Sequence, residues 1–146
     1  MSYRLACDLS SRIAAIAPVA ADMGGYRCKP SRPVPLIAFH GTDDNIIHYE
    51  GGKYSVEDWA AINECSEETE VVFQRGKVTC VAYKGCKQNA TVEFCTIKGG
   101  GHTWPGAIDL LKLDPVKYRR LGQTTQDIDG SQAIWEFFSE HPRPND

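Results

Sequence analysis

Apolar residues in the first third of the chain form short blocks whose spacing predicts one helix and two strands. Four of them share one face at helical spacing over residues 2–9, which predicts a helix there. Residues 13–17 form a short apolar run that predicts a buried strand. The run at residues 36–39 is apolar without alternation, as expected for a strand covered on both faces. Such strands are typical of a parallel sheet.

Two further helices are predicted from start and stop signals. Ser55-x-x-Asp58 has the form of a capping box, and the apolar spacing that follows predicts a helix from Ser55 to about residue 63. Near the end of the chain, Asp129 precedes a segment with apolar residues on one helical face. That helix is expected to stop at His141-Pro142.

Runs rich in β-branched and aromatic residues predict three more strands, at residues 71–73, 78–83 and 91–97. A turn at Arg75-Gly76 suggests that the first two form a hairpin. Strands that alternate with helices favour an α/β fold, in which helices flank a mostly parallel sheet. We therefore predict one structural unit with this architecture.

The composition predicts a folded domain and excludes two classes of partner. The 146 residues are 42% hydrophobic and 24% charged, and the formal net charge is −3 with both signs interspersed. No basic patch indicates a nucleic acid or an anionic membrane as partner. No apolar run reaches the roughly eighteen residues that a membrane span requires. We expect a neutral substrate, either small or polymeric.

Six cysteines are many for a chain of this length in a reducing compartment. Their spacing lacks the paired Cys-x-x-Cys of zinc sites, so disulfides and a secreted, extracellular protein are the better interpretation, with no metal. Six cysteines allow about fifteen full pairings, and spacing does not choose among them. Residues 13–21 also have features of a secretory signal, but Cys7 and Asp8 stand where its apolar region should begin, which favours the strand.

The first candidate for chemistry is the stretch Phe39-His-Gly-Thr-Asp-Asp-Asn45, where a predicted buried strand ends in small and acidic residues. In open α/β sheets, ligands and catalytic groups gather outside the carboxyl ends of the strands. Asp43 or Asp44 is therefore a candidate catalytic acid. An Asx turn that caps the end of the strand explains the same residues, and spacing leaves both interpretations open.

The second candidate is Ile97-Lys-Gly-Gly-Gly-His-Thr-Trp-Pro-Gly106, again after a predicted strand. His102 lies between flexible glycines and a stiffer segment, which suits a general base whose imidazole titrates near neutral pH. The alternatives are a histidine in an ordinary glycine-rich loop and a phosphate-binding turn. The latter is disfavoured because no lysine or helix start follows the glycines. Trp104 is expected either to line a substrate pocket or to lie in the core.

An acid at position 43 or 44 followed by His102 matches the chain order of α/β-hydrolases, in which a serine comes first, then the acid, then the histidine. That serine normally lies in a Gly-x-Ser-x-Gly turn, and the chain contains no such motif. The triad is therefore incomplete in this sequence.

The sequence resembles a known family, the secreted polyhydroxybutyrate depolymerases and feruloyl esterases of the α/β-hydrolase superfamily. Nearly the whole chain takes part in the resemblance, which rests on Met1-Ser-Tyr-Arg-Leu-Ala-Cys7, Ile13-Ala-Ala-Ile-Ala-Pro-Val19, His40-Gly-Thr-x-Asp44, Tyr49-Glu-Gly-Gly52, Gly99-Gly-Gly-His-Thr-Trp-Pro-Gly106 and Thr124-Thr-Gln-Asp-Ile-Asp129. The resemblance implies that residues 1–146 are the C-terminal part of a single α/β-hydrolase domain and begin just after the nucleophile elbow. It also implies that Asp44 is the acid, that His102 is the base, and that Cys65 and Cys86 form a disulfide.

The implied function is hydrolysis of a carboxylic ester by an upstream serine, with no metal or organic cofactor. A feruloylated polysaccharide, a polyhydroxyalkanoate and a smaller ester are all candidate substrates. The alternative is a catalytically inactive remnant or binding domain that lacks the nucleophile. A disulfide-linked carbohydrate-binding module is a third hypothesis, which the alternation of helices and strands disfavours.

Overall fold

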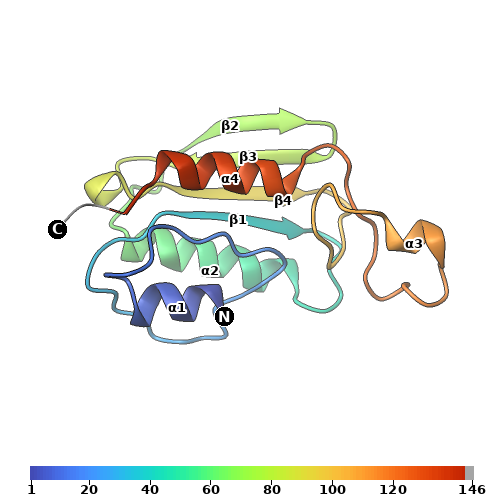
Figure 1. Cartoon of the computed structure of the whole chain (residues 1–146), viewed down its shortest axis with the longest axis horizontal. Helices are drawn as coiled ribbons and strands as arrows, with labels where there is room; N and C mark the ends of the chain where they lie inside the picture. The colour runs from blue at the N-terminus through green and yellow to red at the C-terminus, as the bar shows by residue number, and fades with distance from the viewer. Residues whose placement is uncertain (144–146) are drawn as a thin grey trace.

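The fold is a four-stranded sheet with helices on both faces (Figure 1). The structure is a computed structural model that describes residues 1–143. In the order of the sheet, its strands are β1 (Leu36–Gly41), β4 (Val92–Ile97), β3 (Val78–Tyr83) and β2 (Thr69–Arg75). The helices are α1 (Ser2–Asp8), α2 (Tyr49–Ile62), the short α3 (Leu110–Leu113) and α4 (Gly130–Glu140), and a 3-10 turn spans Lys87–Asn89.

The sheet is mixed, which corrects the expectation of a mostly parallel one. β1 and β4 are parallel, whereas β3 runs antiparallel to both β4 and β2. The reason lies in the connections. A parallel pair requires a crossover of a dozen or more residues, and the links at residues 76–77 and 84–91 are too short for one. The connection between β1 and β4, in contrast, contains α2 and the β2–β3 hairpin.

The predicted strand at residues 13–17 does not form a regular strand. This segment lies along β1 in parallel orientation but makes only two isolated bridges, Ile16 to Leu36 and Val19 to Phe39. Pro18 has no backbone N–H to donate, although its carbonyl accepts a hydrogen bond from the backbone N–H of Phe39 at 3.0 Å. The segment is therefore an irregular neighbour of β1 at the edge of the sheet.

Helix α2 begins earlier than the Ser55 capping box predicted. His48 precedes its first turn, and Ser55 lies inside the helix, where its hydroxyl donates to the carbonyl of Gly51 at 2.7 Å. The same hydroxyl accepts from the backbone N–H of Met23 at 2.8 Å. The prediction of the helix start was wrong because two glycines in the first turn, Gly51 and Gly52, hide the helical pattern.

The other predicted elements are present with small shifts in their bounds. α1, β1, β2, β3 and β4 all fall on their predicted segments, and α4 begins as predicted after Asp129. The Asp129 carboxylate accepts a hydrogen bond from the backbone N–H of Gln132 at 3.0 Å, which is the usual contact of an N-cap residue.

Alternate residues of β1 face two different hydrophobic cores. Leu36 and Ala38 pack with α1 and α2, whereas Ile37 and Phe39 pack with Phe137 of α4. Every residue of β1 is buried, which explains why its sequence shows no alternation.

All six cysteines form disulfides, in the pairs Cys7–Cys28, Cys65–Cys86 and Cys80–Cys95. Cys80 and Cys95 lie directly opposite each other on β3 and β4. Within residues 1–143, no helix combines the length and apolar character that crossing a bilayer requires.

Candidate active site

Two loops meet at the carboxyl ends of the neighbouring parallel strands β1 and β4. The backbone N–H of Asp43, after β1, donates to the carbonyl of Gly100, after β4, at 2.9 Å. In return, the Thr42 hydroxyl accepts from the backbone N–H of Gly99 at 2.7 Å. These bonds join two segments that are far apart in the sequence. This is the edge where open α/β sheets place functional groups.

The glycines in these loops are required by close backbone packing. A Cβ atom on Gly41 would overlap with the carbonyl oxygen of Gly100, and a Cβ on Gly101 would overlap with that of Leu121. Only glycine permits such an approach. The run of glycines before His102 therefore allows the two loops and residues 121–122 to pack as bare backbone.

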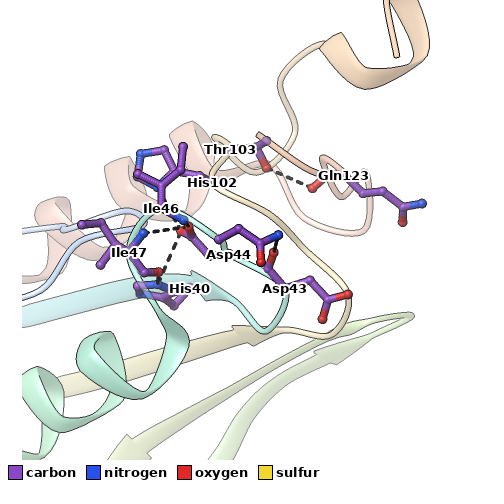
Figure 2. A network of polar contacts seen from close by, with 9 residues as sticks. His40, Asp43, Asp44, Ile46, Ile47, His102, Thr103 and Gln123 are labelled. Atoms are coloured by element: carbon purple, nitrogen blue, oxygen red, sulfur yellow. Dashed lines mark hydrogen bonds and ion pairs between the residues drawn. The ribbon is translucent and has the colours of Figure 1, made fainter. Parts of the chain in front are cut away.

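Asp44 carries a fully buried carboxylate at this junction, with a side chain that is 0% exposed. Its Oδ1 accepts the backbone N–H groups of Ile46 at 2.8 Å and Ile47 at 3.0 Å. Its Oδ2 accepts the Nδ1–H of His102 at 2.9 Å, and Figure 2 shows the two side chains pointing toward each other. Burial of a charge is tolerated only when such donors replace water, so the environment of Asp44 is built for an anion.

His102 presents its other nitrogen outward. Because the Asp44 carboxylate can only accept, Nδ1 of His102 carries the proton in the neutral imidazole, and Nε2 of that form has a free electron pair. The side chain is 31% exposed, and within residues 1–143 Nε2 has no hydrogen-bond partner. A neutral imidazole held in this tautomer can take a proton from a hydroxyl placed at Nε2.

Asp43 differs from Asp44 in exposure and in contacts. Its carboxylate is exposed, accepts from the Thr42 hydroxyl at 3.0 Å and points away from His102 (Figure 2). The Asx-turn interpretation also holds, but at Asp44, whose Oδ1 accepts N–H groups two and three residues ahead. The turn and the contact with His102 are made by the two oxygens of one carboxylate.

The chain is similar to feruloyl esterases. It is 36% identical to feruloyl esterase B of Piromyces equi over 122 residues, which cover 70% of this chain and 22% of that protein. It is 28% identical to feruloyl esterase D of Neurospora crassa over 141 residues, which cover 95% of this chain and 43% of that protein. A third relative, the bifunctional acetylxylan esterase/xylanase XynS20E of Neocallimastix patriciarum, is 21% identical over 144 residues, 95% of this chain and 18% of that enzyme.

The chain thus spans less than half the length of each of these three esterases. No protein-family model matches it. None of the three relatives is named a polyhydroxybutyrate depolymerase, so that part of the resemblance rests on the sequence motifs alone.

Trp104 lies at the surface, not in the core. Its side chain is 45% exposed, and its indole N–H donates to the hydroxyl of Ser131 at 3.1 Å. It lines an apolar pocket of about 300 Å³ together with residues from three other segments, including Ser2 and Leu5 of α1 and Phe138 of α4. The start of the chain therefore lies close to the loop that carries His102.

His40 is a site residue that the sequence analysis did not single out. It continues β1 by one residue beyond the predicted apolar run and is only 2% exposed. Its Nε2 lies 2.9 Å from the carbonyl oxygen of Ile47 and 3.5 Å from Oδ2 of Asp44. The signal in the sequence was the position of His40 at the end of a buried strand, four residues before Asp44. Within residues 1–143, no group of three or more His, Cys, Asp or Glu side chains is arranged to hold a metal ion.

Proposed function

We propose that this chain supplies the acid and the base of a serine carboxylic-ester hydrolase, with Asp44 as the acid and His102 as the base. The proposal is carried by the hydrogen bond between the buried Asp44 carboxylate and Nδ1 of His102, which leaves Nε2 of His102 free. The similarity to esterases supports an ester as the substrate.

In the proposed reaction, an upstream serine hydroxyl attacks the ester carbonyl while Nε2 of His102 accepts its proton. Asp44 keeps the imidazole in the required tautomer and stabilises the imidazolium that forms. His102 then donates the proton to the departing alcohol. Water, activated by the same imidazole, releases the acid from the acyl-serine. No metal or organic cofactor takes part in the proposed steps.

We further propose that residues 1–146 are the C-terminal part of one α/β-hydrolase domain whose serine lies upstream of Met1. Within residues 1–143, the backbone groups of Ala15 and Ala17 have no hydrogen-bond partner, so the outer side of this segment is free to pair with another strand. The apolar pocket shared by Ser2 and Trp104 places the start of α1 beside the His102 loop. A serine just before α1 would thus lie near the proposed base.

The substrate we propose is an ester of the kinds expected from the sequence: a feruloylated polysaccharide, a polyhydroxyalkanoate or a smaller ester. Trp104 would line the site for the acyl or alcohol group, because its exposed ring borders an apolar pocket large enough for an aromatic acid. Secretion is the proposed localisation, and the three disulfides are consistent with it.

The test starts from the source gene. The DNA upstream of the Met1 codon is sequenced, the complete reading frame is expressed, and hydrolysis of methyl ferulate and p-nitrophenyl acetate is measured. We expect a Gly-x-Ser-x-Gly shortly before Met1, and a loss in kcat of about 10⁴-fold or more for Asp44→Ala and for His102→Ala. Asp43→Ala is the matched control and should retain activity.

Two results would reject the proposal. One is a complete protein in which His102→Ala retains esterase activity. The other is a stop codon or unrelated sequence upstream of Met1, which would make the chain a remnant or binding domain. In that case the 146-residue chain should hydrolyse esters no faster than its His102→Ala variant.

A further inference from the structure

Two histidines, one on β1 and one in the loop after β4, approach the same oxygen of Asp44. His102 donates to Oδ2 from the surface side, and His40 lies beneath it in the core, with Nε2 at 3.5 Å from Oδ2 (Figure 2). The proposed reaction does not use His40, which is too deeply buried to meet a substrate. Its role must therefore be exerted through the groups that it contacts.

The protonation of His40 follows from its closest partner. Nε2 lies 2.9 Å from the carbonyl oxygen of Ile47, and a carbonyl can only accept, so Nε2 carries the proton. The same nitrogen lies 3.5 Å from Oδ2 of Asp44, the oxygen to which the His102 Nδ1–H donates. His40 thus bonds one end of the 44–47 turn and borders the carboxylate at its other end.

Helix α2 holds the His40 ring in place. A Cβ atom on Gly52 would overlap with Nδ1 of His40, so the ring fills the space that this glycine leaves open. Tyr49, in the first turn of α2, packs against the ring edge to face, with ring centroids 6.0 Å apart and planes at 84°. The ring cannot rotate without displacing the helix, and its N–H is therefore aimed at the 44–47 turn.

We propose that His40 is a positioning residue that fixes Asp44 for His102. By holding the carbonyl of Ile47, the His40 N–H keeps the turn closed in which Ile46 and Ile47 donate to Oδ1 of Asp44. With Oδ1 held there, Oδ2 faces Nδ1 of His102. The side chain of Asp44 is fully buried, so these protein donors, and not water, hold the carboxylate while the turn is closed. The proposal concerns the geometry of the pair and holds whether or not the pair serves an esterase.

The test uses the 146-residue chain itself and NMR spectroscopy, so the outcome does not depend on a nucleophile. In the ¹⁵N-labelled wild type, the ring nitrogen shifts of His102 report the Nδ1–H tautomer, and its Nδ1 proton, protected in the bond to Asp44, gives a low-field signal. The spectrum of His102→Ala assigns both signals.

His40→Phe keeps the ring and removes the donor, and we expect the low-field Nδ1 proton signal of His102 to be lost through exchange with water. His40→Gln places an amide N–H near the position of Nε2 and should restore the signal, whereas the shorter His40→Asn should not. Val92→Ala, a cavity variant in the core on the α2 side of the sheet, is the matched control. It should lower the melting temperature and leave the His102 signals unchanged.

The proposal fails if His40→Phe or His40→Asn retains the wild-type His102 signals, because His40 would then be a core residue without influence on the pair. If His40→Phe does not fold, the comparison of His40→Gln with His40→Asn decides the question. Equal His102 spectra in those two variants would overturn the proposal, and a signal present only in His40→Gln would support it.

Discussion

Asp44→Asn, with Asp43→Asn as its control, tests whether the buried carboxylate contributes more to the free energy of unfolding than its exposed neighbour. In Asp44→Asn, the amide oxygen can still accept from the N–H groups of Ile46 and Ile47. The amide nitrogen, however, takes the place of Oδ2 and can only donate, so Nδ1 of His102 must accept and the proton of the ring moves to Nε2. The buried site then holds a neutral amide in place of a carboxylate.

The expected magnitude follows from that contact. The charge-assisted hydrogen bonds to the Asp44 carboxylate are replaced by weaker bonds to a neutral amide, which costs about 2–3 kcal/mol of unfolding free energy. For a chain of this length, this corresponds to a decrease of roughly 6–10 °C in melting temperature. Asp43→Asn preserves the contact of an exposed side chain with Thr42, so its effect should stay within about 0.5 kcal/mol.

The assay is urea unfolding of the oxidised chain, followed by tryptophan fluorescence, which changes on unfolding because Trp59 is fully buried in the folded state. Free energies of unfolding come from linear extrapolation to zero urea. An unchanged slope of free energy against urea concentration indicates that the denatured state is unaffected. The reasoning would be refuted if Asp44→Asn unfolded within 0.5 kcal/mol of the wild type. It would also be refuted if the two variants lost the same stability, because burial would then not distinguish the carboxylates.

Three further predictions concern other parts of the fold. Gly52→Ala should destabilise the chain by about 1–3 kcal/mol in the same urea assay, because the new methyl group overlaps with the His40 ring. An unchanged unfolding midpoint would show instead that α2 can shift away from the ring. Burial raises the pKa of Glu93, so the charged form of this side chain destabilises the fold. The free energy of unfolding therefore falls as the pH rises from the ordinary glutamate pKa of about 4.3 through the raised pKa of the folded state. Glu93→Gln should therefore melt higher than the wild type at pH 7 but not at pH 4 in calorimetry, and an equal difference at both pH values would contradict this. Replacing both Cys65 and Cys86 by serine removes a disulfide between residues with a sequence separation of 21, and the loop-entropy relation gives a loss of about 3 kcal/mol in unfolding free energy. An unchanged melting temperature in thermal unfolding would disprove this prediction.

Local patterns were sufficient to predict the elements that position the site. The continuous apolar run of β1 indicated a strand buried on both faces, and the change to acidic residues after it indicated the carboxyl edge of a sheet. The same reasoning placed His102 after β4, and the structure brings His102 and Asp44 to one edge. The strands and their ends could be predicted because burial and strand ends are encoded within a few residues.

The failures were tertiary in origin. The direction of β3 depends on the length of its connections, and strand composition alone does not distinguish parallel from antiparallel pairing. The start of α2 was misplaced because Gly52, a poor helix former, is required by the His40 ring of another element. For the same reason His40 was not singled out, since its role depends on contacts with a turn and a helix that lie after it in the chain.

The connection between β1 and β4 has a consequence for how relatives of this chain are found. The Asp44 and His102 loops are joined directly by backbone hydrogen bonds, and the polypeptide between them leaves the junction through α2 and returns through the hairpin of β2 and β3. The outermost strand, β2, pairs with β3 and is separated from β1 by two strands, so this segment can change in length at its outer edge without moving the pair. A search that looks for the Asp44 and His102 motifs at any separation would therefore retain relatives in which this segment differs in length, whereas one that requires a constant number of residues between them would discard those relatives.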